Sequence, residues 1–517
     1  MKIYLTQSRK EIFHLLNDNR GDMLKRVIFF CFFFFASLTP LAPCSIAAQD
    51  LQPKADPPLA EKYIEYDTDI IPPAEYKARR DSMMKELGEN SVAVFYSAPE
   101  RVRNGDVEYP YHQNDNFYYL TGFSEPNAIL FLIPAGTMVH DPSDTSKMML
   151  TKEILFVQPR VPSREQWTGR RYGPEGAMKL RGFTYAMTND KFKSMFTRIL
   201  FSSRPKRLYV PSFASDFDGE IKELMQPVQN IIDQSPAWHS SIEVCDPGPL
   251  VYSMRAVKSP AEIAMIRKAA HISAVAHNQA MMSCEPEMHE YDLQALYLYV
   301  FHRMGAEDIP YPCIVGAAEN SVILHYETDR REIHDGDLVL ADCAAEYHNY
   351  ASDVTRTYPV NGKFTEPQKA IYKIVLDASN ACINLIKPGV SWRDVQAKSE
   401  EVITDGLYKL GIIKEKSREQ MRRFYMHGVG HPVGLDVHDA GKDTLATGMV
   451  MTVEPGIYIA EGSEGVDSKY FNIGVRIEDD ILVTADGYEI LSKESPRDIK
   501  DIEILMRKKG IGNQPLQ

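Results

Sequence analysis

The pattern of apolar and polar positions predicts alternating helices and strands in the first half of the chain. It predicts an amphipathic helix over residues 76–87, followed by a strand over residues 91–96. Short apolar runs at residues 128–133 and 154–157 predict further strands. We therefore expect residues 60–245 to form a mixed α/β amino-terminal domain.

A second domain, residues 250–517, is predicted from a clear helix start. Ser259 can cap a helix, Pro260 suits its first turn, and Glu262 completes a capping box three residues after the cap. Helical and strand-like runs then alternate, so we predict the α+β class. The expected helices are 260–282, 290–304, 366–386 and 392–410, and the expected strands are 337–347, 350–360, 449–459 and 473–484.

The first 48 residues differ from the rest of the chain and resemble a secretory signal peptide. Basic residues precede a Phe-rich apolar run at 27–38, and prolines and small residues follow it. A run of this length is too short to span a bilayer. We expect cleavage after Ala47 or Ala48, no stable membrane insertion, and an exported protein, periplasmic or secreted. Two interpretations of residues 1–22 remain open: translation begins at Met23, or these residues form a long amino-terminal part of the signal peptide.

Composition and charge narrow the class of protein. The chain has 517 residues, 44% hydrophobic and 25% charged, which is ordinary for a globular protein of two or more domains. Its 58 basic and 71 acidic residues give a net charge of −13, which argues against a nucleic-acid partner. Five of the seven cysteines follow the predicted signal peptide and are scattered, so no disulfide framework or zinc ribbon is predicted.

Two aspartates mark the first candidate site. Asp342 ends a run rich in Val and Leu, and Asp353 lies in the next run, so the two runs predict a hairpin joined by a short polar turn. An Asp within an apolar strand is costly to bury unless a cation lies nearby or the strand opens to solvent. One such Asp alone is more often simply capped or solvated.

A block of three histidines provides a second candidate site. His427, His431 and His438 lie within twelve residues. The glycines and the proline between them make a helix improbable, and no Glu follows His427, so the helical zinc-protease motif does not fit. We expect a loop or a strand to present these side chains.

Two glutamates complete the set. Glu454 follows one apolar run and Glu478 lies in another, two residues from Arg476 and therefore on the same expected strand face. The four carboxylates and one imidazole would balance two divalent cations, and oxygen-rich ligation favours manganese, magnesium or another hard ion. The candidate metal ligands are Asp342, Asp353, His431, Glu454 and Glu478.

These residues lie in motifs that resemble the pita-bread metallopeptidases, and among them aminopeptidase P, the Xaa-Pro aminopeptidases. The catalytic-domain motifs are HGVGHPVGLDVHD, VEPGIY and GVRIEDD. The amino-terminal domain adds YPYHQNDNFYYLTGFSEPNAIL and SREQWTGRRYGP. The resemblance covers nearly all of the chain after the signal peptide, and it implies a pita-bread catalytic domain.

The resemblance also implies roles for individual residues. Asp342 would bind one metal ion, His431 and Glu454 the other, and Asp353 and Glu478 would bridge both. The expected ions are two Mn²⁺. Glu454 would act as the base, and Arg476 would steady the carboxylates or the peptide. The substrate-side residues would be His325, His427 and His438.

The expected activity is release of the first residue from peptides with proline in second position. We also expect a homo-oligomer. An Xaa-Pro dipeptidase, or prolidase, shares the five ligands and is the main alternative. A non-catalytic peptide-binding protein on the same scaffold is the other, but it predicts broken ligands, and all five are present here.

Overall fold

The computed structural model describes residues 66–211 and 242–513. The predicted signal peptide, residues 1–48, lies outside the described residues. Within the described ranges, no helix has both the length and the apolar character needed to span a membrane.

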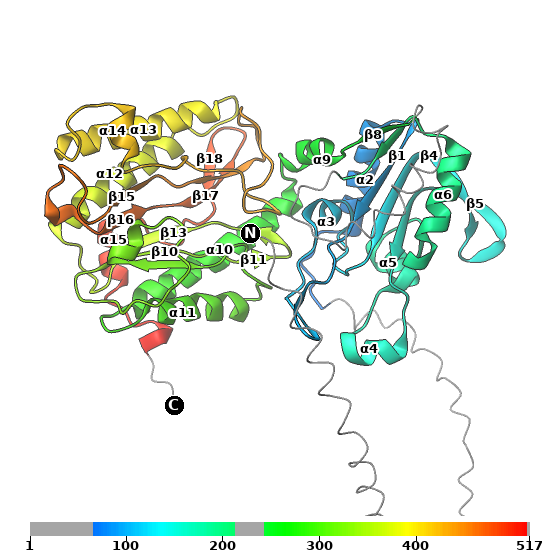
Figure 1. Cartoon of the computed structure of the whole chain (residues 1–517), viewed down its shortest axis with the longest axis horizontal. Coiled ribbons are helices and arrows are strands. Elements are labelled where there is room, and N and C mark those ends of the chain that lie inside the picture. Colours follow the sequence, from blue (N-terminus) through cyan, green and yellow to red (C-terminus); the bar gives the residue numbers. More distant parts are fainter. Residues whose placement is uncertain (1–65, 212–241, 514–517) are drawn as a thin grey trace, which may run out of the picture. The chain divides into compact units, whose positions relative to one another are not determined.

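The amino-terminal domain contains a six-stranded mixed sheet with the order β6-β5-β4-β1-β7-β8 (Figure 1). The strands are β1 Ser91–Tyr96, β4 Ile129–Asp141, β5 Asp144–Val157, β6 Ala186–Thr188, β7 Arg207–Tyr209 and β8 Glu243–Cys245. The helices are α2 Pro73–Leu87, α3 Asp115–Thr121, α4 Pro162–Thr168, α5 Gly173–Arg181 and α6 Phe192–Ser203. A small hairpin joins β2 Val102–Asn104 to β3 Val107–Glu108.

Strand β1 is buried on both faces, which explains its uninterrupted apolar sequence. Ala93 and Phe95 belong to one core cluster, which also contains residues of α2. Val92 and Val94 belong to a second cluster together with Phe196 of α6. Alternate side chains of a strand point to opposite faces of the sheet, so β1 contributes to two cores. The predicted helix 76–87 is confirmed with three more residues at its start, and the predicted strand 91–96 is confirmed.

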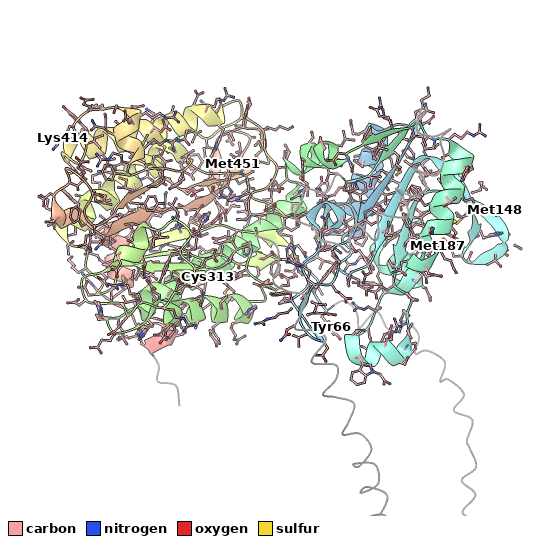
Figure 2. The ribbon with its side chains drawn as sticks, viewed as in Figure 1. Tyr66, Met148, Met187, Cys313, Lys414 and Met451 are labelled. Atoms are coloured by element: carbon pink, nitrogen blue, oxygen red, sulfur yellow. The ribbon has the colours of Figure 1, made fainter. Side chains whose placement is uncertain are left out.

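The strands predicted at 128–133 and 154–157 are confirmed but are much longer in the structure. β4 and β5 pair as an antiparallel hairpin that extends beyond the core. Met138 and Met148 in this extension are 48% and 47% exposed, and Met148 lies at the outer end of the ribbon (Figure 2). Val139 in this extension is buried in the second core cluster, but most of its neighbours are exposed. The sequence of the extension therefore lacks the sustained apolar alternation that identifies a strand.

A buried ion pair stabilises the amino-terminal domain and provides a test of this core. Arg80 of α2 donates from Nε to Glu153 Oε2 at 2.8 Å and from Nη1 to Leu120 O at 3.0 Å. We expect Arg80→Ala to lower the free energy of unfolding by about 3–5 kcal/mol, because it leaves the Glu153 carboxylate buried and unpaired. Lys77→Ala, which removes a solvent-accessible ion pair with Asp81 on the same helix, should cost about 0.5 kcal/mol or less. Urea denaturation of both variants measures the difference, and equal losses would contradict this expectation.

The carboxy-terminal domain consists of two halves, each with two helices followed by an antiparallel sheet. In the first half, α10 Pro260–Ser283 and α11 Glu290–Arg303 precede the sheet β13-β10-β9. In the second half, α12 Glu366–Ile383 and α13 Trp392–Lys409 precede the sheet β14-β17-β18. In the view of Figure 1, α13 lies above the strands and α11 lies below them. The four predicted helices are confirmed, as is the capping box, in which Ser259 N donates to Glu262 Oε2 at 2.9 Å.

Each of the four strands predicted in this region is divided in two, which corrects the prediction of continuous strands. The observed pairs are β10 Leu338–Asp342 with β11 Glu346–Tyr347, β12 Tyr350–Ala351 with β13 Thr355–Pro359, β14 Val450–Val453 with β15 Gly456–Ile459, and β16 Ile473–Arg476 with β17 Asp479–Val483. The remaining elements are α9 Gly248–Arg255, α14 Arg418–Arg422, α15 Ile499–Leu505, β9 Ile314–Ala317 and β18 Tyr488–Ile490.

The predicted hairpin with a short polar turn is confirmed despite the divided strands. The turn residues His348 and Asn349 have φ values of 50° and 63°, as expected for a tight two-residue hairpin turn. In both hairpins the pairing resumes in the same register after the break, so that Glu454 lies opposite Glu478. Three of the five candidate metal ligands lie in the breaks, and Asp342 is the last residue of β10.

Candidate metal centre and active site

All nine residues predicted to form the site line one cavity of about 320 Å³. They come from both hairpins, from the loop before β10 and from the histidine block, which lies outside any regular helix or strand, as predicted. Sequence-distant segments therefore converge here. The nine residues are His325, Asp342, Asp353, His427, His431, His438, Glu454, Arg476 and Glu478.

Backbone N–H groups released at the strand breaks connect the ligand-bearing segments. Glu454 N donates to Val429 O, in the histidine block, at 2.8 Å. Glu478 N donates to Thr355 O, in the other hairpin, at 3.2 Å. Pro455 follows Glu454 and has no N–H, so a continuous ladder is impossible at that position. These hydrogen bonds pair the backbone N–H groups at the breaks, and they join the three segments that carry candidate ligands.

Three candidate ligands approach one another closely. Asp353, His431 and Glu478 each present a ligand atom within 4.8 Å of the others. His431 Nε2 lies 3.4 Å from Asp353 Oδ2 and 3.6 Å from Glu454 Oε1. His431 Nδ1 donates to Pro432 O at 3.1 Å, which turns Nε2 towards the carboxylates. A metal-binding imidazole usually makes such a hydrogen bond through its other nitrogen.

Tyr311 links the fifth ligand, Asp342, to this group and is not among the residues predicted from the sequence. Its hydroxyl lies 2.6 Å from Oδ1 of Asp342 and 2.6 Å from Oδ1 of Asp353. The tyrosine precedes β9 in a Pro-Tyr-Pro run with no local sign of metal chemistry. Its contact with the two carboxylates is visible only in the folded structure.

Arg476 orients the carboxylate of Asp342. Its Nη2 lies 2.6 Å from Asp342 Oδ2, and its Nε donates to Thr355 Oγ1 at 3.1 Å. The expectation that Arg476 and Glu478 lie on one strand is wrong, because β16 ends at Arg476 and Glu478 lies in the break that follows. Both side chains nevertheless reach the cavity, and Thr355 Oγ1 donates to Glu478 Oε2 at 2.6 Å.

The electrostatics of the cavity favour bound cations. Burial raises the pKa of Asp342 and of Glu478, and raises the pKa of Glu454 to about 7. Burial opposes protonation of His431, but the Asp353 and Glu454 carboxylates raise its pKa to about 9. Among the described residues that line the cavity, Arg476 is the only Arg or Lys. Four carboxylates and one imidazole form a hard donor set, and therefore these residues fit divalent ions such as Mn²⁺ or Mg²⁺.

The other histidines differ in their freedom to contact a substrate. His427 is fixed on both ring nitrogens, since Nδ1 donates to Gly428 O and Tyr458 Oη donates to Nε2, each at 2.8 Å. Burial lowers the pKa of His427 to about 3 and keeps it neutral. The ring of His438 lies edge-on to that of His431, with centroids 4.2 Å apart. His325 and His438 are exposed and line the cavity, so a substrate can reach them.

Comparison with known proteins places this site in a family. Residues 264–485 match the model of metallopeptidase family M24, and residues 76–209 match the aminopeptidase P N-terminal domain. The chain is 38% identical to Xaa-Pro aminopeptidases of Haemophilus influenzae and Escherichia coli, with alignments that cover 84% of this chain and 98% and 97% of those proteins. The chain belongs to the aminopeptidase P family of metallopeptidases. It is therefore an enzyme, a metal-dependent peptide hydrolase.

Solved structures agree with this assignment. A substrate complex of an Escherichia coli aminopeptidase P variant superposes with a TM-score of 0.77 at 37% identity, covering 85% of this chain and 99% of that one. Aminopeptidase PepP of Pseudomonas aeruginosa gives a TM-score of 0.78 at 37% identity, with the same coverage. The predicted fold class, a mixed α/β amino-terminal domain followed by a pita-bread catalytic domain, is confirmed.

Proposed function

We propose that this enzyme is an Xaa-Pro aminopeptidase that uses two divalent metal ions. The observation that supports this most directly is the convergence of four carboxylates, three of them buried, and the His431 imidazole in one cavity. The similarity to Xaa-Pro aminopeptidases extends over both domains, which supports the same substrate class. The proposal is tested by measuring kcat/KM for peptides with proline in second position and for the same peptides with alanine there.

The five candidate ligands would hold the two ions. Asp342 would bind one ion, His431 and Glu454 the other, and Asp353 and Glu478 would contact both. When bound, two divalent ions in such a site lower the pKa of a water molecule and polarise a carbonyl group. Arg476 and Tyr311 would hold Asp342 in place through the contacts they already make.

The remaining residues would handle the proton and the substrate. Glu454 would accept a proton from the water molecule, because its carboxylate lines the cavity beside His431. His325 and His438 are exposed to the cavity and would donate hydrogen bonds to the peptide. His427 would act as a fixed wall of the site, since Tyr458 and Gly428 occupy both of its nitrogens.

The metal requirement gives a direct test. We expect a chelator to abolish peptidase activity and Mn²⁺ to restore it best among divalent ions, because the donor set is rich in oxygen. Elemental analysis should find up to two ions in each active chain and almost none after chelation. Full activity in protein shown to be free of metal would contradict the proposed chemistry.

An Xaa-Pro dipeptidase remains the second candidate function, because the same five ligands and the same domain order would serve it. A non-catalytic peptide-binding protein is disfavoured, because all five candidate ligands line the cavity. No nucleic-acid partner is proposed, given the net charge of −13.

We further propose that the protein is exported and forms homo-oligomers. The apolar run at 27–38 supports export, and cell fractionation tests it. Trp167 on α4 is 89% exposed, and α4 has no buried residue, so this helix is accessible to a second copy of the chain. Light scattering of the wild-type protein and of Trp167→Ala tests the second proposal.

A further inference from the structure

Helix α10 contacts the hairpin of Asp342 and Asp353 at the point where its strands break. The β10–β13 ladder stops at Asp342, and the β11–β12 ladder resumes in the same register. Residues 343–345 and 352–354 lie between the two ladders, and all six are buried. Within this break the strands keep two backbone hydrogen bonds, from Cys343 N to Val354 O at 3.3 Å and from Ser352 N to Ala345 O at 3.2 Å. The other buried backbone groups need hydrogen-bond partners from elsewhere.

His277, in α10, directs one ring nitrogen at carbonyl groups on both sides of the break. Its Nε2 lies 3.0 Å from Cys343 O and 2.8 Å from Val354 O. Each carbonyl belongs to the residue that directly follows a candidate metal ligand. Tyr297 Oη donates to His277 Nδ1 at 2.9 Å, which places the ring proton on Nε2. Burial lowers the pKa of His277 to about 3, so the ring is neutral and has one N–H to share between the carbonyls.

Ser273 lies one turn before His277, on the same face of α10. Its Oγ accepts a hydrogen bond from Ala345 N at 2.9 Å and lies 2.8 Å from Ser352 Oγ. Ser352 Oγ in turn donates to Ala345 O at 3.0 Å. Ser273, His277 and Ser352 are each fully buried. Two side chains of one helix face therefore bind backbone or side-chain groups on both strands of the broken segment.

We propose that Ser273 and His277 are positioning residues of the metal centre, which hold the broken hairpin segment so that Asp342 and Asp353 face one cavity. The inference rests on the proposed function, since it requires these carboxylates to bind ions. Neither side chain lines the cavity. They act through the backbone, by fixing the peptide groups that follow each aspartate.

A purely structural role predicts a different outcome from a positioning role. If His277 only stabilises the core, its loss lowers stability but leaves the metal affinity of the folded protein unchanged. If His277 positions the aspartates, its loss weakens metal binding, because the two carboxylates then reach the ions only after reorganisation. Removal of a residue that supports metal ligands typically weakens affinity about 10–100-fold.

The test is calorimetric titration of the metal-free, full-length protein with Mn²⁺. We expect His277→Leu to weaken binding about 10–100-fold. His277→Gln should bind close to wild type, because its amide N–H can replace the Nε2–H donor. Met281→Ala is the matched control: Met281 is fully buried on the same helix, so its truncation lowers thermal stability but should leave Mn²⁺ affinity unchanged.

Ser273→Ala provides an independent variant if His277→Leu does not fold, and it should weaken Mn²⁺ binding in the same direction. Wild-type affinity in the folded serine or histidine variants would overturn the inference, and so would equal losses in Met281→Ala. If wild-type protein itself binds no Mn²⁺, the proposed function fails and the inference fails with it. If wild-type protein binds Mn²⁺ and the folded variants bind it equally well, only the inference fails and the proposed function stands.

Discussion

Asp353→Ala and Glu478→Ala should each abolish turnover and weaken binding of both metal ions. Both side chains are buried, and both lie within 4.8 Å of the third ligand, His431. A residue shared between two ions contributes to both sites, so its loss should lower the metal content by more than one ion. Elemental analysis and a peptidase assay on the same preparations measure both effects.

His438→Ala is the matched control for these variants. His438 lines the cavity and contacts the ring of His431, but it is exposed. As a substrate-side residue it should reduce the rate about 10²–10³-fold, the usual cost of removing a hydrogen bond made in the transition state. The metal content should stay close to wild type. Loss of metal in His438→Ala, or a normal metal content in Asp353→Ala, would contradict the proposed roles.

The candidate ligands could be predicted because each lies in a short segment with its own chemical signature. Acidic residues such as Asp342 and Glu454 stand out at the ends of apolar runs, since a carboxylate there needs a cation or access to solvent. Three imidazoles in a glycine-rich block are equally conspicuous. The family resemblance then assigned roles that the residues alone left open. Convergence in one cavity is a property of the fold, and the structure supplies it.

The breaks in the strands were not predictable from the apolar pattern. The register continues across each break, and therefore residues on both sides keep the alternation of one strand. Pro455 was the one local signal, because a residue without an N–H interrupts a ladder. The other breaks depend on partners far away in the sequence, such as Thr355 O for Glu478 N.

Residues that support the site without being candidate ligands were not predicted either, because their contacts also lie far away in the sequence. Tyr311 contacts Asp342 and Asp353 only after the hairpin and the segment before β9 come together. His277 lies on the buried face of a long helix. A histidine in such a position is most simply interpreted as a core residue. Periodicity predicts the face on which a side chain lies, but it does not predict the carbonyl groups that the side chain meets.

Peptides with proline in second position should be cleaved far better than the same peptides with alanine there. The bond before proline has no N–H, and the ring fixes φ, so recognition depends on a shaped pocket rather than on a backbone hydrogen bond. Apolar side chains of Pro312, Ile314 and Leu324 line the cavity beside His325 and can contact such a ring. Loss of ring methylenes from a fitted pocket typically costs about 10–200-fold in kcat/KM. Similar rates for both peptides would contradict proline specificity.

The length of the preferred peptide separates the two candidate enzymes. An aminopeptidase must leave room beyond the proline for a continuing chain, whereas a dipeptidase would close that end and bind the free carboxylate with a cation. Among the described residues that line the cavity, Arg476 is the only Arg or Lys, and its guanidinium already contacts Asp342, Thr355 and Tyr458. A new carboxylate would have to displace one of these partners. We therefore expect kcat/KM for Xaa-Pro peptides of three to five residues to exceed that for Xaa-Pro dipeptides, and a strong preference for dipeptides would assign the enzyme as a prolidase.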